Sequence, residues 1–341
     1  MRAKFKNPRA QHDFIGRACS ITGVGSYVPE KILTNADLEK IVETSDEWIT
    51  TRTGIKERRI AAADEATSDL AAKAALRAMA MAGVTAEQID LIVVASITPD
   101  MPFPNTACLV QQKIGARRVP AFDIEAACSG FIYALEVGQN FIMSRSCDTV
   151  LVIGAEKLSS ITNWKDRNTC VLFGDGAGAA VLQHRPDAHG LLTTVLGADG
   201  NKAGLLSMPG GGSACPATAK TVADGLHFLR MDGKETFKNA VQAMCSAANE
   251  ALQRCELEIR QIKCIIPHQA NRRIVDAVGE RLGATPEQVF VNLHKYGNTS
   301  AASVAIALDE AVHSGKIQRG DLILIVAFGA GLTWGAAVIE W

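Results

Sequence analysis

Three side chains, those of Cys128, His268 and Asn298, could act together in acyl-transfer chemistry. Each lies between an apolar run typical of a strand and a pattern typical of a helix. The partial positive charge of a helix N-terminus lowers the pKa of a nearby thiol and favours the thiolate. Free N–H groups at that end can hold an oxyanion, and histidine and asparagine can donate hydrogen bonds to developing negative charge. The pattern makes Cys128 a candidate nucleophile.

The stretch EAACSGFIYAL (125–135) places Cys128 between two predicted elements. VPAFDI (119–124) is apolar and typical of a strand, and apolar residues recur at helical spacing in GFIYALEVGQNFIM (130–143). A cysteine in such a turn is more often a small buried hydrophobe. Taken alone, this context therefore favours packing for Cys128.

The other two candidates occupy similar turns. In IIPHQANRRIVDAVGERLG (265–283), His268 follows a predicted strand that ends at Pro267. In VFVNLHKYGNTSAASVAIALDEAVHSG (289–315), Asn298 lies in a loop before a predicted helix. Ligands bind outside the carboxyl ends of the strands in open α/β sheets. We therefore expect these side chains to converge with Cys128.

Two neighbouring residues and two other protein classes compete with this interpretation. His294 and Asn292 lie near the third segment, and spacing does not exclude them from the roles given to His268 and Asn298. A papain-like hydrolase uses Cys, His and Asn in the same chain order, but its cysteine context is absent here. GDGAGAA (174–180) suggests a nucleotide-binding module, yet the flanking VLF and AAVL favour a strand–turn–strand.

The composition is that of an ordinary globular enzyme, with 341 residues, 48% hydrophobic content and a net charge of −1. This charge gives no reason to expect nucleic acid or a membrane as a partner. The nine cysteines are scattered without a CxxC pair, so we expect no disulfide framework, no metal site and a cytoplasmic location. No apolar run reaches the roughly 18 residues of a membrane span, and the basic N-terminus lacks the apolar region of a secretory signal.

Strand-like runs alternate with Ala-rich helical runs, which indicates an α/β fold. CVLFGDGAGAAVL (170–182) is similar to LIVAFGAGLTWGAAVI (324–339), and an earlier helix and strand are echoed by residues 237–267. The echoes indicate internal duplication. We therefore expect a basic extension, an N-terminal half with the cysteine, and a C-terminal half with the histidine and asparagine. Their predicted bounds are 1–20, 21–187 and 188–341.

From about Ile21 to Trp341 the sequence resembles β-ketoacyl-acyl-carrier-protein synthase III, an initiating ketoacyl synthase of the thiolase superfamily. The resemblance implies a five-layered αβαβα fold of two similar halves, which agrees with the duplication. The motifs that carry it are ITGVGSYVPE, TSDEWITTRTGIKERRIA, AACSGFIYAL, FGDGAGAAVL, PHQANRRI, YGNTSAASVAIALDEA and AFGAGLTWGAAVIEW.

The resemblance also implies the reaction. An acyl-CoA primer acylates Cys128, malonyl-acyl-carrier protein loses carbon dioxide, and its carbanion attacks the acyl-enzyme to give 3-oxoacyl-acyl-carrier protein. This step begins type II fatty-acid synthesis and uses no cofactor. The alternative is a related condensing enzyme of secondary metabolism with another acyl donor or nucleophile, and a papain-like hydrolase is a remote third.

Further site residues follow from the resemblance. His268 and Asn298 would stabilise the enolate, and the backbone N–H groups of Cys128 and Ala330 would form the oxyanion hole. Ala330 replaces a glycine of some members, and it can serve if its φ is negative. Phe328 would lie beside the carboxylate that is lost.

The binding surfaces follow in the same way. Phe103 would reach across a homodimer to shape the partner's acyl pocket. Because the carrier protein is acidic, a basic docking patch is expected, although Glu280 stands where a basic residue often supports docking. The residues that the resemblance assigns to CoA are Trp48, Arg52, Arg167 and Asn271. Those that it assigns to the docking patch are Lys238, Arg273 and Arg281, with Arg272 adjacent.

Overall fold

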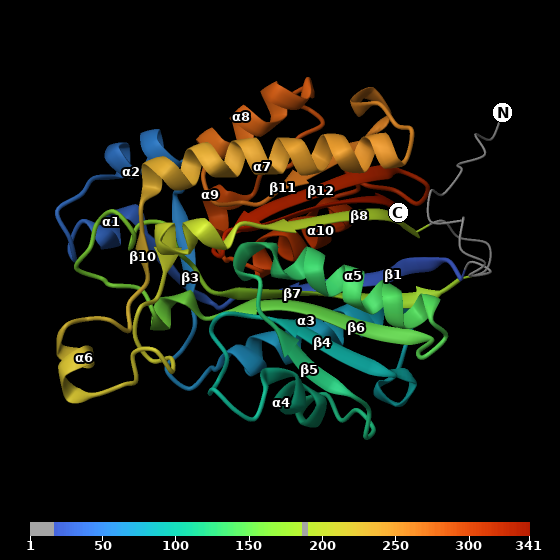
Figure 1. Cartoon of the computed structure of the whole chain (residues 1–341), viewed down its shortest axis with the longest axis horizontal. Coiled ribbons are helices and arrows are strands. Elements are labelled where there is room, and N and C mark those ends of the chain that lie inside the picture. Colours follow the sequence, from blue (N-terminus) through green and yellow to red (C-terminus); the bar gives the residue numbers. More distant parts are fainter. Residues whose placement is uncertain (1–16, 186–189) are drawn as a thin grey trace.

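The computed structural model describes residues 17–185 and 190–341, and its main body is built on two β-sheets (Figure 1). The first sheet has the order β1-β7-β6-β4-β5 and the second the order β11-β12-β13-β8. The strands of the first are β1 Cys19–Tyr27, β4 Leu91–Ala95, β5 Ala121–Ile124, β6 Thr149–Glu156 and β7 Gly176–His184. Those of the second are β8 Gly190–Ala198, β11 Cys264–Pro267, β12 Leu322–Gly329 and β13 Thr333–Glu340.

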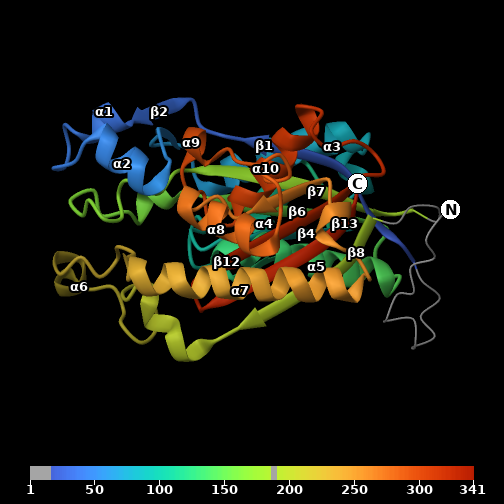
Figure 2. The same ribbon diagram turned by 90° about the horizontal axis from the view of Figure 1, so that it is seen from above.

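Helices form the other three layers of the fold (Figures 1 and 2). The middle layer, between the two sheets, is α5 Gly130–Met143 and α10 Ala302–His313. The outer layer on the first sheet is α3 Thr67–Ala82 and α4 Thr106–Lys113, and that on the second is α7 Gly233–Arg254 with α8 Arg272–Leu282 beside it. Among the described helices, none is both long enough and apolar enough to cross a bilayer. The predicted five-layered αβαβα fold is confirmed.

The two sheets repeat one pattern of strand directions. In the first, β1 and β6 run antiparallel to β7, and β4 runs parallel to β6. In the second, β8 and β12 run antiparallel to β13, and β11 runs parallel to β12. Helix α3 covers the first set of strands as α7 covers the second. This correspondence is what internal duplication predicts.

The predicted boundaries of the two halves fall at or next to residues that the structure does not describe. The junction at 187/188 lies within 186–189, which are not described, and residues 1–16 of the predicted extension are not described either. Strand β1 already begins at Cys19, two residues before the predicted start of the first half. The folded body therefore includes the end of the segment that was assigned to the extension.

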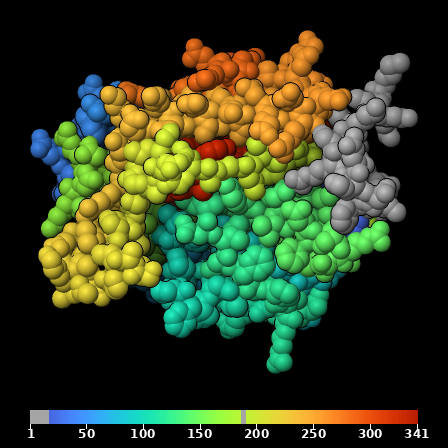
Figure 3. All heavy atoms as spheres, in the orientation of Figure 1, coloured from blue at the N-terminus to red at the C-terminus, as the bar shows by residue number. Residues whose placement is uncertain are grey.

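Short elements gather at one end of the layered body in both ribbon views (Figures 1 and 2). The segment that carries α6 projects there beyond the layers, in yellow in Figure 3. These elements are β2 Lys31–Thr34, α1 Asn35–Leu38, α2 Asp46–Thr53, β3 Glu57–Ile60, β9 Leu206–Ser207, α6 Ala219–Ala223, β10 Arg230–Met231 and α9 Leu293–Tyr296. They surround the carboxyl end of the central strands, where a ligand site is expected.

The GDGAGAA segment differs from its prediction. Residues 171–173 form a turn with a single bridge from Phe173 to Asn298, and the glycine-rich residues from Gly176 onward are themselves strand β7. The glycines serve close packing: a Cβ atom on Gly178 would lie 2.5 Å from the Ala305 Cβ of α10. The strand–turn–strand prediction is therefore wrong in its first strand, but no helix follows the glycines as a phosphate loop requires.

Substitution of Gly178 by alanine should destabilise the fold. The added Cβ would clash with the side chain and backbone of Ala305, whose backbone carbon lies 2.7 Å from its position, so β7 and α10 must separate. We expect a loss of about 1–3 kcal/mol in the free energy of unfolding, measured by denaturant titration. Gly200→Ala is the control, because nothing lies within 4 Å of its added Cβ. Equal stability of the two variants would contradict the packing argument.

Candidate active site

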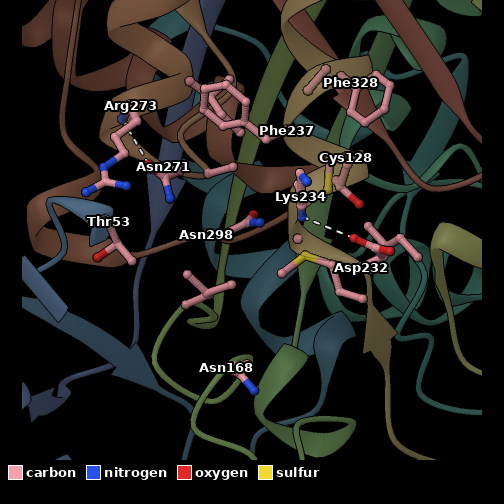
Figure 4. A pocket seen from close by; sticks show the side chains of 18 of the residues that line it. Thr53, Cys128, Asn168, Asp232, Lys234, Phe237, Asn271, Arg273, Asn298 and Phe328 are labelled. Carbon is pink, nitrogen blue, oxygen red and sulfur yellow. Dashed lines mark hydrogen bonds between the residues drawn. The ribbon is translucent and has the colours of Figure 1, made fainter. Parts of the chain in front are cut away.

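Cys128, His268 and Asn298 line one cavity of about 1020 Å³ (Figure 4). Cys128 lies in a 3-10 turn between β5 and α5. His268 directly follows β11, and Asn298 lies between α9 and α10. The structure thus brings together three turns that are far apart in sequence, at one end of both sheets.

The turn that carries Cys128 is fixed by close backbone packing from both sheets. Ala127 has a φ of 45°, in the left-handed region that residues other than glycine rarely adopt. A Cβ atom on Gly329 would lie 2.5 Å from the Cys128 nitrogen, so only glycine lets the end of β12 approach this turn. A Cβ atom on Gly130 would lie 3.0 Å from the Cβ of Ala95. Packing therefore determines where the thiol lies.

The Cys128 side chain is 6% exposed, and burial raises the pKa of its thiol to about 12. Hydrogen bonding from Ser300 and from the backbone lowers this pKa, and the negative charge of Glu156 raises it. The expectation that the helix N-terminus gives this thiol a low pKa is therefore wrong. Desolvation disfavours the thiolate more than these hydrogen bonds favour it. At neutral pH Cys128 is therefore a thiol, and a thiol that is to be acylated must give its proton to an acceptor.

His268 is held in a buried position where its imidazole is neutral. Its backbone N–H donates to the carbonyl of Val326 at 2.8 Å, which joins the turn to β12. The side chain is buried, and this burial lowers the pKa of the imidazole to about 4. A neutral imidazole carries one N–H donor. At neutral pH it can donate a hydrogen bond to an enolate without bringing a buried positive charge.

Asn298 is oriented by its own turn. Its backbone N–H donates to Leu172 at 2.8 Å, and its Oδ1 accepts the backbone N–H of Ser300 at 2.8 Å. With Oδ1 so engaged, the donor Nδ2 is the amide atom that remains for a ligand. The competing residues are placed otherwise, because Asn292 Nδ2 donates to Glu310 at 2.8 Å and His294 is exposed outside the cavity lining.

A hydroxyl network joins the Cys128 turn to the predicted oxyanion strand. Ser129 Oγ donates to Thr333 Oγ1 at 2.7 Å, and Thr333 Oγ1 lies 2.9 Å from the carbonyls of both Ala126 and Ala330. Ala330 is not among the non-glycine residues with positive φ, so alanine is accommodated here without strain. The network fixes the spacing between the two predicted oxyanion donors, the N–H groups of Cys128 and Ala330.

Two family models match the segments that build this site. A model described as 3-oxoacyl-[acyl-carrier-protein] synthase III matches residues 122–200, and a model of its C-terminal part matches residues 252–341. A β-ketoacyl-[acyl-carrier-protein] synthase III of Caldanaerobacter subterraneus subsp. tengcongensis is 59% identical over 324 residues, 95% of this chain and 98% of the relative. The chain belongs to the β-ketoacyl-acyl-carrier-protein synthase III family.

Solved structures of the synthase III family agree with the fold. That of the Aquifex aeolicus VF5 enzyme has 50% identity and a TM-score of 0.89, covering 95% of this chain and all 100% of its own. That of the Thermus thermophilus enzyme has 48% identity and a TM-score of 0.87, covering 94% and 99%. Like the rest of the synthase III family, the chain is an acyltransferase of the condensing type, and the predicted enzyme class is confirmed.

The entrance of this synthase III cavity is built around one aromatic ring. The guanidinium carbons of Arg52 and Arg167 lie 4.6 and 5.0 Å from the centre of the Trp48 ring. Trp48, Arg52 and Asn271 line the cavity, whereas Arg167 reaches it only through its contact with the ring. Asn271 caps α8 and donates to the carbonyl of Arg52 at 3.1 Å. These four residues therefore form one cluster at the opening.

Helix α7 supplies cavity residues that sequence reasoning missed. Asp232 caps this helix by accepting the N–H groups of Lys234 and Glu235 at 3.2 and 3.1 Å, and both Asp232 and Lys234 line the cavity that holds Cys128 (Figure 4). Phe237 and Met244 continue the lining along the same helix. The aspartate before GKET was a detectable cap signal, but it does not reveal which end of α7 faces a cavity.

Of the other residues predicted from the sequence, some line the cavity and others lie outside its lining. Phe328 is 4% exposed and lines the cavity near Cys128 (Figure 4). Phe103 is 83% exposed and lies outside the lining of its own chain's cavity. On the outer helices, Lys238 and Arg281 are exposed and do not line the cavity, whereas the neighbouring Arg273 does.

Replacement of Thr333 by valine should slow acyl transfer while the fold persists. Valine keeps the shape but removes the hydroxyl that joins the Ser129 turn to the Ala330 carbonyl. Loss of one oxyanion donor costs about 10²–10³ in rate, and we expect a loss of up to about 10-fold because this change only misaligns one. The measurement is acyl-enzyme formation in a single turnover. Thr194→Val, which removes a buried hydroxyl without a partner on β8, is the matched control. Equal rates in the two variants would remove the positioning role.

Proposed function

We propose that the chain condenses an acyl-CoA primer with malonyl-acyl-carrier protein and so begins type II fatty-acid synthesis. The observation that carries the proposal is the meeting of a buried thiol, a neutral imidazole and an oriented amide in one cavity. Panels of acyl-CoA with malonyl-acyl-carrier protein, read by product mass, test it. A condensing enzyme of secondary metabolism would yield a product from another acyl donor or another nucleophile.

Cys128 forms the acyl-enzyme in this proposal. Its sulfur attacks the thioester carbonyl, and the N–H groups of Cys128 and Ala330 donate hydrogen bonds to the oxyanion of the tetrahedral intermediate. Transfer from one thioester to another is nearly balanced in energy, so a thiol nucleophile suits both the forward and the later step. The close packing of Gly329 on the Cys128 nitrogen supports this geometry.

His268 and Asn298 then promote decarboxylation. Loss of carbon dioxide generates a thioester enolate directly, so the site must stabilise negative charge on the thioester oxygen rather than supply a strong base. Two neutral donors in a buried cavity meet this need, because hydrogen bonds strengthen where water is excluded. Phe328 supplies an apolar surface beside the departing carboxylate, which favours the uncharged product.

The arginine–tryptophan cluster is the proposed CoA site. An adenine ring can stack on Trp48 and Arg167, and Arg52 and Asn271 can contact the other parts of CoA. Asn271 holds the end of α8 against α2 at the same opening. The cavity leads from this cluster to Cys128, as a phosphopantetheine arm requires.

The carrier protein would dock on the faces of α7 and α8 that flank the opening. Lys238 and Arg281 are exposed there, and Arg273 lies at the rim, where its guanidinium donates to the carbonyl of Thr51 at 3.0 Å. Glu280 is exposed beside them and limits the extent of the basic patch. An acidic carrier would be attracted to this patch despite the near-zero net charge.

We also propose that the protein is a homodimer located in the cytoplasm. Phe103, largely exposed, is a large apolar side chain without cover in its own chain. Met101 on the same segment is also exposed, and contiguous exposed apolar groups mark interaction surfaces. In the dimer it would enter the partner's acyl pocket and help to set the primer length.

Cys128→Ser should abolish acyl transfer from acyl-CoA. A serine hydroxyl in the same buried turn is far less acidic than a thiol, so it offers no usable nucleophile. Incubation with radiolabelled acyl-CoA and mass analysis of the tryptic peptide measure the loss. Labelling of the enzyme in this variant would show that Cys128 is not the nucleophile.

Alanine variants of His268 and Asn298 should still accept the acyl group on Cys128 but release carbon dioxide more slowly. Each removes one donor to the enolate, for which a loss of about 10²–10³ in rate is expected. Carbon dioxide release from labelled malonyl-acyl-carrier protein is measured beside acylation in the same preparation. Wild-type release in both variants would refute the decarboxylation role.

A further inference from the structure

A buried carboxylate lies at the end of β6, next to the turns that carry the active site. Glu156 is fully buried, and its Oε2 accepts the hydroxyls of Ser96 and Thr98 at 3.2 and 2.5 Å. The backbone N–H of Ile97 lies 3.2 Å from both carboxylate oxygens. Nothing in the condensation chemistry described above uses this group.

Close packing places Glu156 near the turn of the second half. On the same strand, a Cβ atom on Gly154 would lie 2.4 Å from the carbonyl oxygen of Ala301, so β6 touches the residue that follows Ser300. Ser300 has a φ of 47° and is 1% exposed. Its Oγ is buried and makes no hydrogen bond of ordinary geometry among the described residues. A buried hydroxyl left unpaired in a native structure calls for an explanation.

The Cys128 thiol and the Glu156 carboxylate both lie near this hydroxyl. Ser300 lies close enough to lower the pKa of each by hydrogen bonding, and the charge of Glu156 reaches Cys128 and raises its pKa. The hydroxyl can therefore accept a proton from the thiol and donate its own to the carboxylate after a small rotation. This is the arrangement of a one-step relay.

We propose that Glu156 accepts the proton of Cys128 during acylation, with the Ser300 hydroxyl as the relay between them. The proposal rests on the acyl-transfer function proposed above. It makes Glu156 and Ser300 positioning and proton-transfer residues that act through the nucleophile. The substrate itself is not contacted.

The groups around Cys128 differ in their fitness for this task. Burial lowers the pKa of His268 to about 4, so it is a weak base, whereas burial raises the pKa of Glu156 to about 7. A base with a pKa near the working pH is the most effective. The charged groups next to Glu156 are engaged elsewhere: Lys157 Nζ donates to the Ala62 and Glu65 carbonyls, and Asp175 accepts from Ser159 and Ala61.

With this relay, every proton that moves in the reaction has a donor and an acceptor. As sulfur bonds to the acyl carbon, the S–H proton passes to Ser300 Oγ and the Ser300 proton passes to Glu156. The bond from the acyl carbon to the CoA sulfur breaks, and the CoA thiolate takes its proton from solvent. When the carbanion later displaces the acyl group, the released Cys128 thiolate recovers the proton along the same path. The overall reaction consumes one solvent proton for each carbon dioxide released.

The test is the pH dependence of single-turnover acylation in the wild type, Glu156→Gln and Ser300→Ala. In the wild type, the rate should rise as Glu156 ionises near pH 7 and then level off. Both variants should lose that inflection and react about 100-fold more slowly at pH 7.5. They should still decarboxylate malonyl-acyl-carrier protein, because His268 and Asn298 are untouched. Acylation of either variant with the wild-type rate and pH profile would overturn the relay.

An alkylation experiment and a control variant distinguish a failure of the relay from a failure of the proposed acyl-transfer function. Alkylation of Cys128 by iodoacetamide, followed on its tryptic peptide, needs no CoA and should show the same inflection in the wild type and none in Glu156→Gln. An unchanged alkylation profile contradicts the relay, whereas a wild type that no acyl-CoA labels contradicts the function alone. Asp175→Asn, the loss of another buried carboxylate, is the matched control and should keep the inflection.

Discussion

The whole structure depends on the close approach of backbones where the two halves meet. Cβ atoms on Gly154, Gly178 and Gly329 would lie 2.4 to 2.5 Å from Ala301, Ala305 and Cys128 respectively. No larger residue fits at these three contacts, and each joins an element of one half to an element of the other. The nucleophile turn and the start of α10 are therefore fixed to each other by packing. The geometry of the proposed catalytic site inherits this rigidity, because Cys128 lies on the first segment and Asn298 lies four residues before α10 begins.

The same packing excludes water, and exclusion of water sets the charge states of the site. Burial raises the pKa of Cys128 to about 12 and that of Glu156 to about 7, and it lowers that of His268 to about 4. In each case the neutral form is favoured. Such a site binds a neutral thioester readily, and its donors act on the charge that develops during the reaction. The corresponding difficulty is that a proton must move before sulfur can attack.

Much of the fold could be predicted from the sequence, because the relevant signals are local. The Ala-rich residues of α3 form a helix, and it stops at Gly83 in the left-handed conformation that glycine adopts most easily. Short apolar runs such as LIVVASI (91–97) and LILIVAF (322–328) are typical of buried strands, and they form β4 and β12. The three turns were recognisable because the period of the apolar residues changes on either side of each.

The remaining features depend on contacts that no local pattern contains. The pKa of Cys128 follows from burial against Gly329, which is remote in sequence and belongs to the other half. Residues 174–180 look like a turn because glycine usually signals one, yet here glycine serves the packing of β7 on α10. Glu156 ends an apolar strand, and nothing in its neighbours indicates that it lies beside the nucleophile.

Duplication explains why one active site needs both halves. Ala127 and Ser300 have nearly the same positive φ, 45° and 47°, and each stands just before a helix of the middle layer. The chain thus forms one kind of turn twice. In the first copy the turn presents a thiol, and in the second it presents a hydroxyl beside the Asn298 amide. Because the helices that follow both turns lie in one layer, the second turn reaches the first, and a single copy would hold the proposed nucleophile without His268 and Asn298.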